Sequence, residues 1–142
     1  MVTTLATIVV FLLSAVPVLA QQLTPSGLPG VWETRWQGSR FSPANGARET
    51  IEETLELRAN GTFRRLQRSI EMSRGSATME GQYEVGASAD GVITSVTIRG
   101  VYYGGSRSGQ FASIVLRPAG ETLVATINPP ELGWMQITFK KR

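Results

Sequence analysis

The stretch SATMEGQYEV, residues 76–85, alternates between two kinds of side chain with a period of two. One set is small, apolar or aromatic and comprises Ala77, Met79, Gly81, Tyr83 and Val85. The other set is polar and comprises Thr78, Glu80, Gln82 and Glu84. Successive side chains of a strand point to opposite faces, so this pattern is typical of an antiparallel strand with one buried and one solvated face.

Seven further segments with strand character surround this stretch, and none of them reads as a helix of three turns or more. They are residues 31–37, 50–58, 62–70, 92–99, 110–117, 121–127 and 134–140. Short turns separate them, notably Asp90-Gly91, Pro118-Ala119-Gly120 and Asn128-Pro129-Pro130, together with longer loops at 38–48 and 104–109. Eight strands joined without a crossover helix predict an all-β, antiparallel, up-and-down barrel, because closure removes unpaired edges.

Asn60-Gly61 is the strongest hairpin signal in the chain. A two-residue primed turn needs positive φ, which Asn and Gly tolerate, so residues 50–58 and 62–70 are expected to pair. In the second of these strands Phe63 and Leu66 lie three residues apart, which breaks the alternation and predicts a β-bulge.

The first 20 residues have no charged side chain and end in Val18-Leu19-Ala20, which is typical of a secretory signal peptide. We therefore divide the chain into a signal peptide (1–20), a connector (21–29) and one barrel domain (30–142), and expect an exported protein, periplasmic or secreted. An uncleaved anchor is the alternative. The apolar run 5–20 is interrupted by Pro17 and is shorter than the roughly 20 residues of a spanning helix, so no stable membrane span is expected.

The composition narrows the chemistry. The chain has no cysteine and no histidine, which removes thiol chemistry, the usual neutral-pH base and the commonest transition-metal ligand. Asp90 is the only aspartate. We therefore expect no catalytic residues, no metal and no cofactor, although a cofactor-free isomerase or cyclase built from Arg, Tyr and Glu stays open.

The net charge of +3 is a mild bias, and two runs of opposite charge face each other across the predicted hairpin. Cross-strand neutralisation explains both runs without a ligand, so no nucleic acid partner is expected. The acidic run is Glu49, Glu52, Glu53 and Glu56, and the basic run is Arg58, Arg64, Arg65 and Arg68.

The chain resembles the lipocalin-like (calycin-type) family of small β-barrels. The resemblance is carried by Gly30-Val31-Trp32, by Asn60-Gly61-Thr62-Phe63, by residues 81–85 and by the basic end 140–142. It implies that Trp32 closes one end of the barrel under a basic residue, Lys140 or Arg142, through a cation–π contact. The disulfides and C-terminal helix of the transport lipocalins have no counterpart here.

Several large side chains are candidates for a ligand site at the other end. Glu53 is expected among the inward apolar residues of its strand, where a carboxylate needs a partner such as Arg65 or Arg99. Trp36, Tyr83, Tyr102, Tyr103, Phe111 and Trp134 are the large aromatic residues away from the closed end. The predicted ligand-binding set is Trp36, Glu53, Tyr83, Arg99, Tyr103 and Phe111, with ordinary core packing as the alternative for the aromatic residues.

Two functions follow from this fold. The first is binding of a small apolar or amphipathic ligand in the barrel mouth. The alternative is an envelope or extracellular interaction module that uses the loops 38–48 and 104–109 around a filled barrel. A cavity of roughly 300 Å³ or more would favour the first, and a lumen filled by side chains would favour the second. The oligomeric state stays open.

Overall fold

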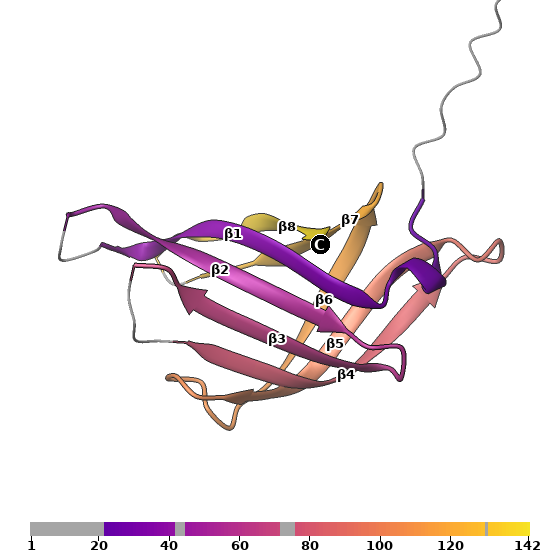
Figure 1. Ribbon diagram of the computed structural model, residues 1–142, viewed down its shortest axis with the longest axis horizontal. Coiled ribbons are helices and arrows are strands. Elements are labelled where there is room, and N and C mark those ends of the chain that lie inside the picture. The colour runs from indigo at the N-terminus through magenta and orange to yellow at the C-terminus, as the bar shows by residue number, and fades with distance from the viewer. Residues whose placement is uncertain (1–21, 42–44, 72–75, 130) are drawn as a thin grey trace, which may run out of the picture.

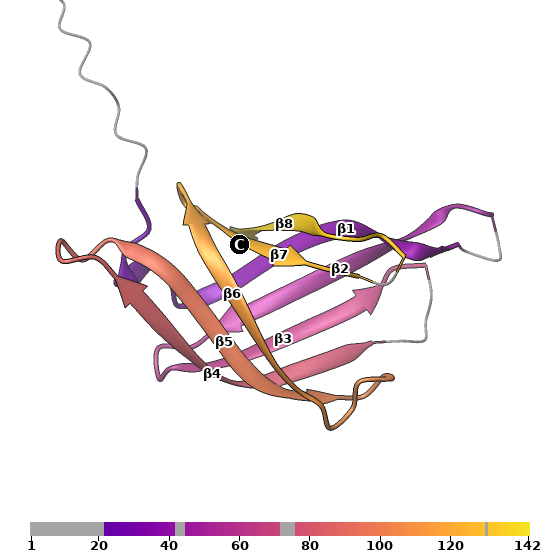
Figure 2. The ribbon, with the colours of Figure 1, turned by 180° about the vertical axis from the view of Figure 1, so that it is seen from behind.

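The computed structural model describes residues 22–41, 45–71, 76–129 and 131–142, so the predicted signal peptide lies outside the described residues. Eight antiparallel strands pair in sequence order and close into a barrel, as Figures 1 and 2 show from opposite sides. The strands are β1 (Gly30–Phe41), β2 (Arg48–Leu57), β3 (Thr62–Ser69), β4 (Ala77–Ala87), β5 (Ile93–Tyr103), β6 (Phe111–Ala119), β7 (Thr122–Ile127) and β8 (Met135–Lys141). The predicted fold class is confirmed.

The Asn60-Gly61 hairpin forms as expected. Gly61 has a φ of +84°, and the side-chain oxygen of Asn60 accepts hydrogen bonds from the backbone N–H and the hydroxyl of Thr62. The ladder between β2 and β3 is continuous from Leu57 opposite Phe63 to Ile51 opposite Ser69. The predicted bulge in β3 is therefore wrong. Phe63 and Arg65 are the buried residues of β3, and Leu66, which the bulge would have placed on the face of Phe63, points outward.

Two strands, β1 and β5, extend four residues beyond their predicted ends. β1 continues to Phe41 into the region expected to be a loop, with a register shift between Gln37 and Phe41. β5 continues to Tyr103 and keeps its pairing with β4 throughout that extension. At both boundaries glycine and polar residues interrupt the alternating pattern, but pairing with the neighbouring strand keeps the chain extended.

One end of the barrel is closed by the segment that precedes β1. A single 3-10 turn, η1 (Pro25–Gly27), brings the buried Leu28 under the barrel, and the indole N–H of Trp32 donates to the Leu28 carbonyl over 2.9 Å. Figure 1 shows η1 at the end that carries the β2–β3 and β4–β5 turns. We call this the closed end. The opposite end, with the β1–β2, β3–β4, β5–β6 and β7–β8 connections, is the open end.

The cation over Trp32 is Lys141. Its Nζ lies 5.9 Å from the ring centroid and donates to the Gly27 carbonyl over 2.7 Å. Lys141 pairs with Trp32 across the β1–β8 seam and shares its face, whereas Lys140 pairs with Glu33 on the outer face. Arg142 is also outside, where its guanidinium pairs with Glu33. The expectation of Lys140 or Arg142 was wrong by one residue of register.

The barrel is unevenly closed along its length. Only Trp32 and Glu33 of β1 pair with β8, and β6 pairs with β7 only from Leu116 to Ala119. Both short ladders lie toward the closed end, so the β7–β8 hairpin is held at its base, and Figure 2 shows β7 and β6 separating toward the open end.

Candidate functional site

A buried polar network crosses the barrel interior between four strands. Glu53 on β2 accepts a hydrogen bond from the indole of Trp36 on β1 over 2.5 Å and one from Nε of Arg65 on β3 over 2.5 Å. A second guanidinium nitrogen of Arg65 also pairs with Glu53. Nη1 of Arg65 donates to the hydroxyl of Tyr102 on β5 over 3.1 Å. Both carboxylate oxygens are therefore satisfied, as a buried charge requires.

Burial of this network makes its charges mutually dependent. The Glu53 side chain is fully buried and that of Arg65 is 6 % exposed. Burial by itself lowers the pKa of the Arg65 guanidinium, but the Glu53 carboxylate and the Tyr102 hydroxyl outweigh it, and the net shift in pKa is upward. Arg65 is therefore a permanent cation whose charge Glu53 neutralises inside the barrel.

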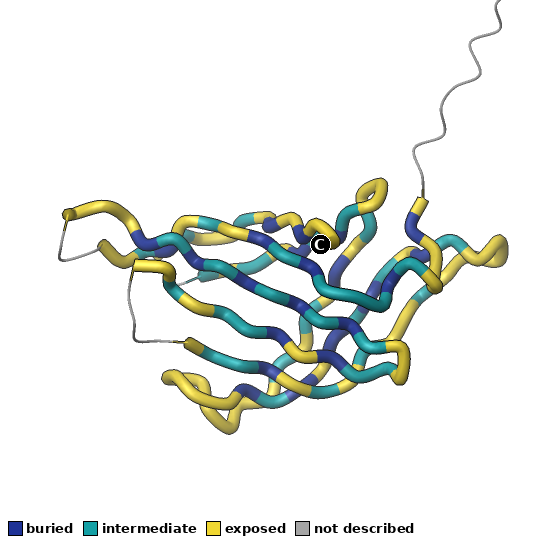
Figure 3. The backbone as a smooth tube through the Cα atoms, in the orientation of Figure 1, coloured by how far each residue is buried: buried dark blue, intermediate teal, exposed yellow. Residues whose placement is uncertain are grey.

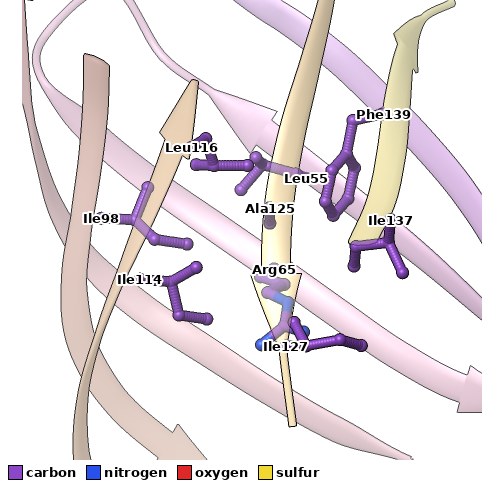
Figure 4. A pocket seen from close by; sticks show the side chains of 9 residues that line it. All are labelled: Leu55, Arg65, Ile98, Ile114, Leu116, Ala125, Ile127, Ile137 and Phe139. Carbon is purple, nitrogen blue, oxygen red and sulfur yellow. The ribbon is translucent and has the colours of Figure 1, made fainter. Parts of the chain in front are cut away.

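A small cavity lies beside the guanidinium of Arg65. Its volume is about 10 Å³, close to the space of a single water and far below the ~300 Å³ of a preformed ligand pocket. Figure 4 shows apolar side chains facing one another around it, with Arg65 next to Ile127. The lining residues are Leu55, Arg65, Ile98, Ile114, Leu116, Ala125, Ile127, Ile137 and Phe139. In this conformation side chains fill the space.

The predicted pairing of Glu53 with Arg65 is confirmed, and Trp36 joins them. Arg99, the other expected partner, faces outward and pairs with Glu84 over 3.0 Å. Tyr103 and Phe111 are exposed on the outside of the barrel. These three positions do not line the interior. The inward residues of β5 have even numbers, so Arg99 and Tyr103 point outward. On β6 the inward residue Leu116 is buried, and Phe111, five positions before it, points outward.

Tyr83 faces inward but lies at the other end from the one we expected. Its hydroxyl donates to the Arg58 carbonyl at the β2–β3 turn over 2.6 Å, and burial raises the pKa of its phenol. Tyr83 therefore helps to seal the closed end. Tyr102, which is not among the predicted ligand-binding residues, lies in the interior network instead. The alternation Ile98, Gly100, Tyr102 would have assigned it to the inner face had the strand been extended past Arg99.

The charged runs of the β2–β3 hairpin meet largely as expected. On the outer face Glu52 pairs with Arg68 over 2.6 Å and with Arg35 over 2.8 Å, and the hydrogen bond from Arg68 is the main cause of its lowered pKa. Arg64 instead pairs with Glu80 on β4. The segment is thus neutralised within the sheet.

A second feature gathers at the open end, on the outer side of the strand ends. Seven large hydrophobic residues of the described chain are exposed, and five belong to this end; Val85 and Val115 are the others. We call these five the apolar rim: Phe41, Ile70, Tyr103, Phe111 and Trp134. Figure 3 shows the described parts of the loops at this end as mostly exposed. Single exposed apolar residues are ordinary, but their gathering at one end marks an interaction surface.

The outer face of β6, β7 and β8 also carries a shallow groove of about 300 Å³. Val115, Pro118 and Val124 supply its apolar lining, and Arg117 is the one charged residue that lines it. The groove faces solvent, and none of the residues that line it belongs to the interior network or lines the interior cavity.

Comparisons with protein-family models, with curated proteins and with solved structures find no match to this chain. Within the part of the chain that the structure describes, no helix is long and apolar enough to cross a membrane. The same residues bring together no group of three or more acidic side chains that could hold a metal ion.

Proposed function

We propose that this protein is an exported interaction module that binds its partner through the apolar rim at the open end of a filled, lipocalin-like barrel. The observation that carries the proposal is the position of Phe41, Ile70, Tyr103, Phe111 and Trp134. They come from five different parts of the sequence and are all exposed at the same end.

The small interior cavity and the exposed aromatic residues support the apolar rim, rather than the lumen, as the binding site. The interior offers about 10 Å³, whereas Trp134 alone leaves 74 % of its surface in water. Exposing a tryptophan to this extent forgoes roughly 1.5–3 kcal/mol of burial that a partner could recover. A filled core with an apolar perimeter fits an interaction module better than a preformed pocket. The rim differs from the loops 38–48 and 104–109 expected from the sequence, because only Phe41 lies within them and the other four residues lie at strand ends or on the β7–β8 connection.

The test is fractionation of cells that export the protein. We expect the wild-type chain to stay with the envelope fraction and the double variant Phe111→Ser/Trp134→Ser to move to the soluble fraction. Val85→Ser is the matched control, because Val85 is an exposed apolar residue near the closed end. Equal distribution of all three proteins, with unchanged thermal unfolding, would contradict a role for the rim.

Carriage of a small apolar or amphipathic ligand is the second candidate function, and one observation favours it. The cavity beside Arg65 is lined on one side by Ala125, Ile127, Ile137 and Phe139 of the β7–β8 hairpin and on the other by the rest of the barrel. Because short ladders hold this hairpin only at its base, its outward displacement would enlarge the cavity.

A disulfide across the β6–β7 gap tests carriage. Continuing the register beyond Leu116 opposite Ala125 places Val115 opposite Thr126. In Val115→Cys/Thr126→Cys, which has no other cysteine, oxidation should close the gap and abolish binding of the neutral apolar probe N-phenyl-1-naphthylamine, and reduction should restore it. Equal probe binding by oxidised and reduced protein would exclude entry at this gap.

A further inference from the structure

We infer that the partner of the apolar rim is the surface of a lipid membrane that contains anionic lipids. This inference rests on the proposed function, since it names the class of partner for the same surface.

The arrangement of the rim favours a flat partner. In an up-and-down barrel the ends of β1, β3 and β5 and the start of β6 reach the same end of the molecule (Figure 1). Phe41, Ile70, Tyr103 and Phe111 therefore project around the perimeter, with Trp134 on the β7–β8 connection. The groove that the structure offers lies elsewhere, on β6 to β8. Apolar side chains around the end of a cylinder can all reach one planar surface at once.

The kinds of residue fit a membrane interface. Four of the five rim side chains are aromatic, and Trp and Tyr are the residues that settle at the level of lipid headgroups. Interfacial binding strengthens with buried apolar area and with attraction between basic residues and anionic lipids. The rim supplies the first term.

The distribution of ion pairs leaves basic residues at the open end that could attract anionic lipids. Seven arginines of the described chain pair with carboxylates, namely Arg35, Arg58, Arg64, Arg65, Arg68, Arg99 and Arg142. Among the described residues, no carboxylate lies within ion-pair distance of Arg40, Arg48, Arg107 or Arg117. The first three of these lie at the open end, where Arg107 also covers the Tyr102 ring at 5.6 Å.

Three acidic groups of the described chain lie at the same end, and two of them are turned to the protein. Glu49 is buried, and Glu71 accepts the backbone N–H of Thr50 over 2.6 Å. Glu131 is exposed on the β7–β8 connection. The guanidinium groups beside the rim are thus left available to lipid phosphates, which accept the paired hydrogen bonds that arginine donates.

The experiment is co-sedimentation of the full exported chain with vesicles. We expect binding to vesicles of equal parts phosphatidylcholine and phosphatidylglycerol, weaker binding to phosphatidylcholine alone, and weakening by salt. Phe111→Ser/Trp134→Ser should reduce the partition coefficient about a hundredfold, since the loss of each buried aromatic side chain should cost about tenfold. Val85→Ser should leave it unchanged.

Fluorescence gives a second readout in the same samples. Trp32 is buried and Trp36 half-buried, so a blue shift of emission on vesicle addition reports Trp134. Arg48→Gln/Arg107→Gln should lose the preference for anionic vesicles while keeping the weaker binding to phosphatidylcholine. Absence of vesicle binding by the wild-type chain, or equal binding by the rim variant, would overturn the inference. If the rim variant still leaves the envelope fraction of cells, the partner is a protein and the proposed function stands.

Discussion

Glu53 and Arg65 show how one residue pair shapes the interior of this barrel. Two opposite charges are removed from water, and their attraction offsets the desolvation only because every carboxylate oxygen has a partner. An apolar pair of the same volume would fill the lumen at less cost. The contribution of the pair to stability therefore depends on both members being present.

Removing one member of this pair should be far more costly than removing an exposed one. Glu53→Gln leaves the buried Arg65 guanidinium uncompensated, and we expect the free energy of unfolding to fall by about 3–5 kcal/mol. The matched control is Glu84→Gln, whose exposed pair with Arg99 should change stability by no more than about 1 kcal/mol. Urea unfolding followed by tryptophan fluorescence measures both. Similar losses for the two variants would show that the interior pair is solvated.

The C-terminal lysines offer a second contrast at this scale. Lys141→Met removes the cation from Trp32 and the hydrogen bond to the Gly27 carbonyl, and should cost about 1–2 kcal/mol. Lys140→Met, one residue earlier on the outer face, should be close to neutral. Thermal unfolding of the two variants compares them directly. A larger effect at position 140 would mean that Lys140, as expected from the sequence, is the cation that stabilises Trp32.

At the scale of elements, alternation identified all eight strands, since each buries one face. It failed where an inward residue is not apolar. Arg65 interrupts the apolar face of β3, and this interruption led to the prediction of a β-bulge. Its partner Glu53, which compensates the buried charge, lies on another strand. It also failed at the ends of β1 and β5, where the neighbouring strand, rather than local propensity, keeps the chain extended.

One pair of glycines shows an element-scale constraint that the pattern concealed. Gly81 and Gly100 lie opposite each other in the β4–β5 ladder, and a Cβ on Gly100 would overlap the Glu80 carbonyl. Gly100→Ala should destabilise the fold by about 1–3 kcal/mol, because the two backbones must separate. In Gly27→Ala the added methyl meets its nearest atom at 3.5 Å, which makes it the control. Chemical denaturation curves with equal midpoints for the two variants would refute a close approach of these strands.

At the scale of the whole molecule, closure of the barrel could be predicted but the state of its lumen could not. Closure follows from eight strands with short connections. Filling depends on how side chains from different strands meet, such as Phe139 of β8 and Leu55 of β2, which both line the cavity, and such contacts leave no local signal. The position of the rim residues could not be predicted either. Tyr103 and Phe111 were expected to line the mouth of the barrel, but both point outward and are exposed. Neighbouring residues of a strand point to opposite faces, so a change of one position decides between the two.

Uneven closure has a consequence for the whole barrel. β4 and β5 share ten residue pairs from Thr78 opposite Tyr103 to Ala87 opposite Ile93, whereas β8 shares two with β1. Local opening needs least free energy where few ladder bonds break, so the β7–β8 hairpin should open before the rest. Native-state hydrogen exchange should therefore show lower protection in Met135–Lys141 than in the centre of β5. The oxidised Val115→Cys/Thr126→Cys variant should regain protection in the hairpin alone. Uniform protection across the eight strands would mean that the barrel opens as one unit, and the hairpin would then offer no entrance to the cavity beside Arg65.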